Sequence, residues 1–505
     1  MTAPYSGPQT RRNIVAFLVG KVPTAVLTAC ILGLSARVLP AAEFGYYVTA
    51  MAAMELVLGL SNFGLDWLLL RFIPEYRLRG TRRGMVRLLA AVLGLRLLLL
   101  AAIAGALLLA PRWLPAGAPA GQLDVLALLL LVEGALRLLR DNTLEALALQ
   151  SRMQAVNVLR GVLLLAALAM LPAATARWLL LAEVLASVVA LPLAAACVLQ
   201  ALRGLPQRPA DGWRAPGARQ LAAVAINNYA SGVVEYLYSP SSLILLMARS
   251  QSPEAMAGLG FVLRLTDIIR NYLPGMVIFS VVRARMIGAY AANRDYPELQ
   301  RWAHFVFKLS ALSLLPVLAA ALVYGGLLLQ LASGGRFGEY HWLFAVLCGW
   351  LALRLHRLIL SVVCNALGLS GMWALASLCS ALLLPLLYWL GAPQLGLWLV
   401  PVALLGNELV VNGLAVAGMQ RRGLAWPLGL RWWGRALLAA AAAASVAWLV
   451  PGRDAAAAAV GTLLLCAVFA VALLLSGAID AMDRKLINRA LGRQLLREAP
   501  DGSPV

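Results

Sequence analysis

The sequence is poor in charge, and poorest in acidic charge. Only 13% of its 505 residues are charged, with 22 Asp and Glu against 42 Lys and Arg, whereas 62% are hydrophobic. An ordinary soluble domain is about one quarter charged and roughly half apolar. A soluble fold cannot bury this much apolar surface, so the composition excludes an ordinary water-soluble protein.

Histidine and cysteine are scarce as well, which leaves little material for a metal or redox centre. The chain has 3 His and 6 Cys. The cysteines lie in or beside apolar runs without the spacing of metal ligands, so we interpret them as small hydrophobic residues. We expect no metal, no other cofactor and no catalytic residue, although a proton or a sodium ion could drive a transport step.

Long loops are absent too, and long apolar runs take their place. A bilayer core about 30 Å thick requires roughly 20 apolar residues per helix, and a chain in lipid must satisfy its backbone hydrogen bonds internally. We predict an all-α integral membrane protein with about fourteen transmembrane helices. The predicted spans are 14–36, 44–73, 88–110, 123–146, 156–173, 178–200, 220–247, 257–282, 302–331, 342–367, 373–391, 395–418, 436–450 and 455–478.

The basic residues predict the orientation of these spans. With the N-terminus inside, most loop Lys and Arg fall on the cytoplasmic side, as the positive-inside rule requires. We therefore expect a multi-pass protein of the bacterial inner membrane with both termini in the cytoplasm. The net charge of +20 then reflects topology and does not indicate nucleic acid. The loop arginines on the outer side are Arg37, Arg112, Arg177, Arg249, Arg336 and Arg453.

The order of spans and loops predicts two halves and a C-terminal extension. An Arg- and Pro-rich stretch, 201–220, separates two six-helix bundles at 1–200 and 221–420, as in transporters built from parallel repeats. Two Ala-rich helices follow in 421–480, and we expect them to pack peripherally or to form a lipid-facing groove. The basic tail at 481–505 suits anionic lipid on the cytoplasmic side.

Several basic residues fall at bilayer depth, where charge is costly and therefore a candidate for function. Lys21 follows Arg12 by nine residues, which is about 13 Å along a helix. In span 257–282 two arginines flank an aspartate on one broad helical face, and span 342–367 carries a second basic cluster that includes His356. One arginine can donate two parallel hydrogen bonds to the oxygens of a phosphate group, so these faces are suited to binding an anion. The predicted substrate-binding residues are Lys21, Arg264, Asp267, Arg270, Arg354 and Arg357.

Acidic residues at depth are candidates for ion coupling, because each could pair with an arginine or bind a proton or a sodium ion. Some charges have a simpler interpretation. Arg96 and Arg160 are expected to reach headgroups from the cytoplasmic side. Glu133 with Arg137 is expected to form a structural pair. The predicted ion-coupling residues are Glu55, Asp66, Glu235 and Glu408.

A pattern near the N-terminus adds a family resemblance. Ala36-Arg37-Val38-Leu39-Pro40 closes the first span, Glu43-Phe44-Gly45-Tyr46-Tyr47 opens the second, and Asn62-Phe63-Gly64-Leu65 precedes Arg71. This pattern resembles the polysaccharide transporter family, which contains the lipid-linked oligosaccharide flippases and belongs to the multidrug/oligosaccharidyl-lipid/polysaccharide exporter superfamily. The chain departs from the family in having Leu39-Pro40 where Leu-Gly-Pro is common, and in having Tyr238 and Ser239 where span seven often carries an aspartate.

The resemblance implies a flippase, not an enzyme. Its substrate would be undecaprenyl-diphosphate-linked oligosaccharide, carried across the inner membrane by alternating access for the export of a surface polysaccharide such as O-antigen or exopolysaccharide. Membrane lipids, a polysaccharide polymerase and export machinery would be its partners. Two alternatives remain open: a small-molecule or other lipid exporter of the same superfamily, and a membrane polymerase or ligase of lipid-linked glycans. The second usually requires a large external catalytic loop, which the sequence lacks.

Overall fold

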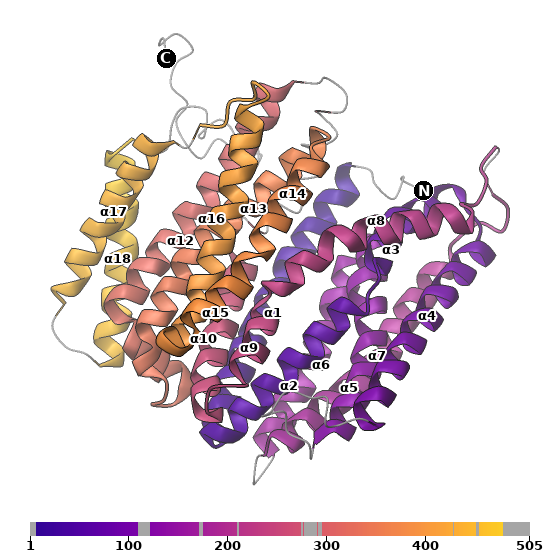
Figure 1. Cartoon of the computed structure of the whole chain (residues 1–505). Helices are drawn as coiled ribbons and strands as arrows, with labels where there is room; N and C mark the ends of the chain where they lie inside the picture. The colour runs from indigo at the N-terminus through magenta and orange to yellow at the C-terminus, as the bar shows by residue number, and fades with distance from the viewer. Residues whose placement is uncertain are drawn as a thin grey trace. The chain divides into compact units, whose positions relative to one another are not determined.

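The computed structural model describes residues 7–109, 122–170, 175–209, 212–273, 276, 290, 295–427, 429–450 and 454–477. These residues form helices joined by short turns (Figure 1). The first group of helices is α1 Gly7–Val38, α2 Ala41–Leu60, α3 Leu65–Arg79, α4 Arg82–Leu109, α5 Leu123–Arg137, η3 Leu138–Leu144, α6 Gln150–Met170, α7 Ala176–Arg203, α8 Ala218–Leu237, α9 Pro240–Met247 and α10 Pro253–Tyr272. The second group is α12 Tyr296–Ser333, η4 Gly338–Tyr340, α13 His341–Ala366, α14 Ser370–Ala381, α15 Leu383–Leu395, η5 Gly396–Trp398, α16 Leu399–Gln420, α17 Leu430–Trp448 and α18 Ala455–Leu475.

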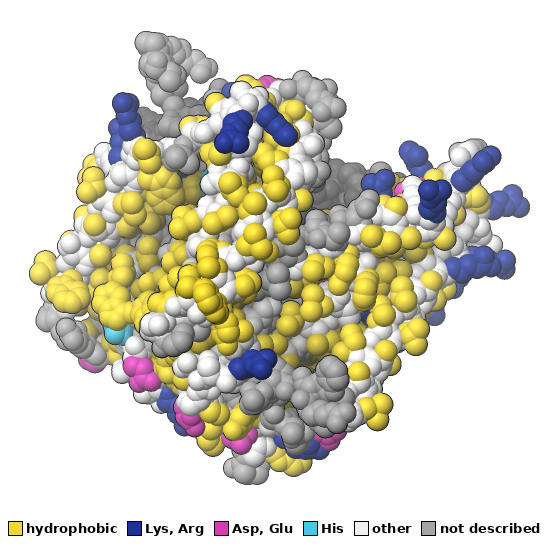
Figure 2. All heavy atoms as spheres, in the orientation of Figure 1, with side chains coloured by type: hydrophobic (Ala, Val, Ile, Leu, Met, Phe, Trp, Pro, Cys, Tyr) yellow, Lys and Arg dark blue, Asp and Glu magenta, His cyan; other side chains and the backbone are white. Residues whose placement is uncertain are grey.

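The all-α membrane fold class is confirmed. Within the described ranges nine helices are long and apolar enough to cross a bilayer, or ten if the bent pair α2 and α3 is one span. The full count of about fourteen spans stays a prediction. On the face shown in Figure 2, hydrophobic side chains cover most of the helix surfaces, while Lys and Arg gather near helix ends. Such a surface suits contact with lipid.

The chain divides into two compact units, each with its own core. Unit 1 comprises 1–268 and 384–400, and unit 2 comprises 269–383 and 401–505. The predicted boundaries at 200 and 220 are not tested by this division and stay predictions. The predicted basic tail at 481–505 lies outside the described residues.

A sharp break separates α2 from α3 in unit 1, and the two helices differ in direction by 56°. Phe63 and Gly64 adopt left-handed φ angles of 46° and 75° there. Gly64 also lies so close to the backbone oxygen of Ala225 that a Cβ atom would collide with it. A break frees carbonyl groups that a continuous helix would satisfy. Tyr229 donates to one of them, the oxygen of Leu60, at 2.7 Å.

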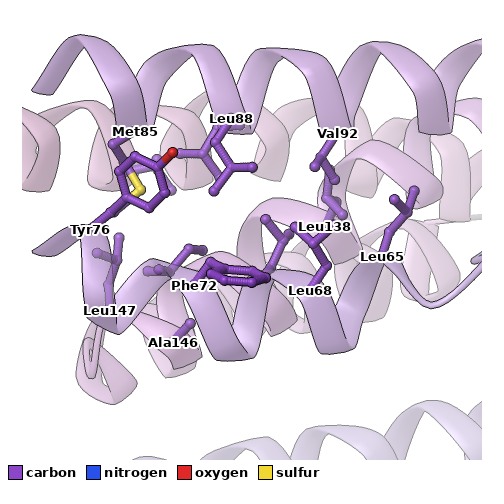
Figure 3. Packing of buried hydrophobic residues seen from close by; sticks show 14 of the residues in the cluster. Leu65, Leu68, Phe72, Tyr76, Met85, Leu88, Val92, Leu138, Ala146 and Leu147 are labelled. Carbon is purple, nitrogen blue, oxygen red and sulfur yellow. The ribbon is translucent and has the colours of Figure 1, made fainter. Parts of the chain in front are cut away.

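Apolar packing holds α3 in this orientation. Figure 3 shows Leu68, Phe72 and Tyr76 of α3 packed with Met85 and Leu88 of α4. Phe72 is fully buried and Tyr76 is 5% exposed. Burying side chains of this size stabilises a fold in water by roughly 1.5–3 kcal/mol each, whereas inside a membrane close packing supplies the gain. The bend is thus fixed by the neighbouring helices as well as by Gly64.

In unit 2 the Ala-rich helices α17 and α18 run beside α12 (Figure 1). Small residues let helix backbones approach closely in a membrane. Gly461 of α18 lies directly against the Tyr324 side chain, and Tyr324 Oη donates to the Ala447 carbonyl oxygen at 2.6 Å. The two C-terminal helices are therefore docked on α12 by close contact and one buried hydrogen bond.

Candidate functional site

Buried ion pairs form the most extensive polar network of unit 1, at the meeting of α5, α6 and α7. Glu133, whose side chain is 2% exposed, accepts from Arg137 Nε at 3.0 Å and from Ser187 Oγ at 2.9 Å. Arg160 Nε lies 3.5 Å from its second carboxylate oxygen. The predicted pairing of Glu133 with Arg137 is confirmed. A group this well satisfied by positive partners acts as a scaffold.

The same network continues to α2 through Glu183. Its carboxylate forms an ion pair with Arg160 Nη2 and accepts a hydrogen bond from Tyr47 Oη at 2.7 Å. Arg160 Nε also donates to Ser187 Oγ at 3.0 Å. Every strong donor around Glu183 is therefore supplied by another helix of unit 1. Two charged side chains, Arg160 and Glu183, and the Tyr47 hydroxyl therefore link α2, α6 and α7.

The expectation that Arg96 and Arg160 reach headgroups is wrong. Arg160 is held by two carboxylates, with its side chain 19% exposed. Arg96 lies near the middle of α4, ~21 Å along the helix axis from Arg82 at 1.5 Å per residue, and is only 5% exposed. The sequence misled because it does not show which face of α4 packs against α2, and Arg96 lies on that face and donates to the Leu58 carbonyl oxygen.

Arg264 and Glu55 form an ion pair that is open to its surroundings. Arg264 Nη1 lies 2.7 Å from Glu55 Oε1, and Ser241 Oγ donates to Glu55 Oε2 at 2.8 Å. The two charged side chains are 32% and 28% exposed. The charge of Asp267 also acts on Arg264. In this pair the carboxylate is partly exposed as well as the arginine, whereas Glu133 is only 2% exposed.

Asp66 differs from the other acidic candidates in its partners. Both of its carboxylate oxygens accept from neutral amides, with Asn62 Nδ2 at 2.5 Å and Asn142 Nδ2 as the donors. Asn142 lies in η3, a π-helical turn of the kind often found at functional sites. Glu55 and Glu408, in contrast, each bind an arginine.

Unit 2 holds a second arginine site, around Glu408 of α16. Arg354 Nη1 and Arg357 Nη1 lie 3.2 Å and 3.5 Å from Glu408 Oε1. Arg354 is 34% exposed, whereas Arg357 is 4% exposed and its Cζ lies 6.0 Å from the centre of the Trp373 ring. Two guanidinium groups share one carboxylate, so the three side chains carry an excess positive charge. Only Arg354 offers that charge to its surroundings.

His356 does not add to this charge, although it lies between the two arginines in sequence. Trp426 Nε1 donates to His356 Nε2 at 3.1 Å, so that nitrogen carries no proton. His356 Nδ1 must then donate to Asn412 Oδ1, 3.0 Å away. The neutral tautomer is fixed by its partners. The residue joins α13 to α16 and to the segment after it.

The other predicted site residues are less informative. Lys21 of α1 is partly buried and feels the charge of Glu145. Arg270 is partly buried at the end of α10, and Glu235 of α8 is exposed. The structure thus pairs Arg264 with Glu55, and Arg354 and Arg357 with Glu408. Arg96 and Arg160 are charged residues of these networks that the sequence analysis did not select as site residues. The sequence signal that could have identified them is a charged residue far from both ends of a long apolar run.

Comparison with solved structures identifies the fold. The lipid II flippase MurJ in an inward closed conformation has a TM-score of 0.66 at 10% identity, over 95% of this chain and 100% of that one. An inward-facing multidrug resistance MATE family transporter of the MOP superfamily has a TM-score of 0.58 at 15% identity, over 81% and 98%. The MATE multidrug transporter DinF-BH has a TM-score of 0.60 at 16% identity, over 84% and 98%. The molecule is thus a multi-pass membrane protein with the fold of these transporters and flippases.

Sequence comparison then gives the family. Residues 10–284 match the family described as "Polysaccharide biosynthesis protein", which is more than half of the chain. The chain belongs to this family, and the resemblance found in its N-terminal pattern is confirmed. A comparison with curated proteins finds no match.

Proposed function

We propose that this protein is a flippase that moves undecaprenyl-diphosphate-linked oligosaccharide from the inner to the outer leaflet of the bacterial inner membrane by alternating access. The family and the fold support a transporter of the polysaccharide pathway. The identity of the cargo is what we add to the family and the fold. The flippase would serve surface polysaccharide export, with both of its termini in the cytoplasm and a polysaccharide polymerase acting on the flipped product.

The open ion pair of Arg264 with Glu55 carries the proposal. A lipid diphosphate is anionic, and crossing the bilayer requires positive groups that can be reached at depth. Arg264 is held by a carboxylate that a phosphate group can replace, because both side chains are about one third exposed. Arg354 in unit 2 is open to a similar degree. The buried Arg357 would neutralise the charge of Glu408, which leaves the charge of Arg354 for the substrate.

Replacement of Arg264 and Arg270 by alanine in one variant tests the cargo assignment. We expect at least a tenfold loss of flipping in proteoliposomes that contain fluorescent undecaprenyl-diphosphate-linked sugar, together with loss of surface polysaccharide in cells. Arg177→Ala is the matched control, because Arg177 pairs with Asp124 on an exposed surface and should be dispensable. Gel filtration and membrane abundance report folding.

Undiminished flipping in the folded double variant would refute the assignment. A wild-type protein that exports dyes or drugs, and fails to flip the lipid-linked sugar, would instead be a small-molecule exporter. Covalent turnover of the lipid-linked sugar by the purified protein would reveal a polymerase or ligase.

A further inference from the structure

The break between α2 and α3 holds a buried guanidinium group with unused donors. Arg96 reaches the break from α4, and Nη2 donates to the freed carbonyl oxygen of Leu58 at 2.7 Å. Within the described part of the chain, Nε and Nη1 have no hydrogen-bond partner. Only 5% of the residue is exposed. A buried charged donor without an acceptor is costly, so its retention calls for a ligand.

One acidic side chain offsets this charge. Asp66 is the acidic group whose field acts most strongly on Arg96. Its hydrogen bonds nevertheless come from Asn62 and Asn142, not from the guanidinium. Asp66 and Arg96 are therefore each hydrogen-bonded to other groups. The free nitrogens of Arg96 remain available to a third group.

Other charges near the break come from three further elements. Arg137 of α5 repels Arg96, and Tyr236 of α8 lies close enough to interact with it. Asp141 of η3 repels Asp66. Glu235 of α8 acts on Tyr236. The charges of Arg96 and Asp141 thus act on Asp66 in opposite directions, and a negative charge bound at Arg96 would add to the effect of Asp141.

We propose that the α2–α3 break contains a binding site for a phosphate-type anion on Arg96, and that binding is coupled to protonation of Asp66. Guanidinium groups bind phosphate oxygens with charge-assisted hydrogen bonds. The bound anion places a second negative charge beside Asp66, which favours the protonated carboxyl group. By linkage, the proton strengthens anion binding to the same extent.

The break gives the site an edge on the molecular surface. Phe63 and Trp67 flank Asn62 and Asp66 in sequence and are 45% and 52% exposed. The Phe63 ring stacks on Tyr229 with centroids 4.9 Å apart. These exposed side chains mark where the break meets the surface.

Binding of pyrophosphate to the full-length protein in nanodiscs tests the site. After correction for the titration of pyrophosphate itself, calorimetry should detect an affinity that falls as pH rises, by up to about tenfold per pH unit for one coupled proton on the protein. Arg96→Gln should lower the affinity at least tenfold, whereas Arg87→Gln, an exposed position on the same helix, should not. Asp66→Asn should retain binding and lose its pH dependence. If Arg96→Gln does not fold, Arg96→Lys should fold and bind more weakly, since lysine lacks the planar fork.

Two arms separate the sources of the phosphate. Competition by undecaprenyl diphosphate in the nanodisc would identify a lipid headgroup, and pyrophosphate binding without such competition would identify a soluble phosphate compound. Either result supports the site. Unchanged binding in Arg96→Gln, or pH dependence that survives in Asp66→Asn, would overturn the proposal. Only the choice of lipid rests on the proposed function, which fails separately if Arg264 proves dispensable for flipping.

Discussion

Glu183 illustrates how much a single buried carboxylate can hold. It accepts from Tyr47 and pairs with Arg160 while its side chain is only 4% exposed. Removing one partner of a buried pair leaves the other charge uncompensated, which is more costly than losing an exposed pair. The distance between two charged partners does not by itself show how much the pair stabilises the fold. The pair of Arg177 with Asp124 is also short, at 2.5 Å, but water can replace each partner there.

Glu183→Gln should therefore lower the free energy of unfolding by about 3–5 kcal/mol, because Arg160 loses a buried counter-ion. Tyr47→Phe removes one neutral donor and should cost about 1 kcal/mol. Thermal unfolding in detergent, followed by tryptophan fluorescence, measures both. Arg177→Gln is the control and should leave the transition unchanged. Equal effects of Glu183→Gln and Arg177→Gln would contradict the scaffold interpretation of this network.

The bend between α2 and α3 is set by a backbone conformation that most residues avoid. Gly64 has a φ of 75°, and the space where its Cβ would lie is filled by the carbonyl group of Ala225. An L-residue there meets both torsional strain and a backbone atom that has no rotamer to move away. The bend in turn positions Asn62 and Asp66, so a local glycine determines where the polar groups of the break lie.

Gly64→Ala should lower the stability of unit 1 by at least ~1 kcal/mol, the cost of a left-handed alanine, and by more if Ala225 cannot shift. Gly94→Ala is the matched control, because Gly94 lies within α4 and nothing lies within 4 Å of its Cβ position. Alanine favours a helix, so that control should be neutral or slightly stabilising. Thermal unfolding compares the two variants. A harmless Gly64→Ala would show that the bend does not depend on glycine.

At the scale of the whole molecule, the composition is that of a membrane protein, and on the face shown in Figure 2 basic side chains gather near helix ends while apolar side chains cover the helices. The predicted orientation follows from the side on which Lys and Arg gather. This prediction states on which side of the membrane each loop and terminus lies, and it can be tested without knowing the cargo.

A green fluorescent protein fused after Val505 should fluoresce, because a cytoplasmic C-terminus lets the reporter fold. Alkaline phosphatase inserted after Gly117 should be active, since the predicted loop there lies outside. Exchanging the two reporters between the sites supplies the control. Activity of alkaline phosphatase at the C-terminus would reverse the predicted orientation.

The sequence determined the membrane class and the helical fold because the length of an apolar run is a local property. It did not mark the break: the predicted span 44–73 runs through Asn62-Phe63-Gly64, where the structure ends α2 and bends the chain by 56° into α3. Only the tertiary structure decided which charges meet. Arg264 and Glu55 are 209 residues apart, and no periodicity within one helix shows which neighbour its polar face will touch. The burial of Arg96 was decided in the same way, because it depends on which helix packs against the face of α4 that carries this residue.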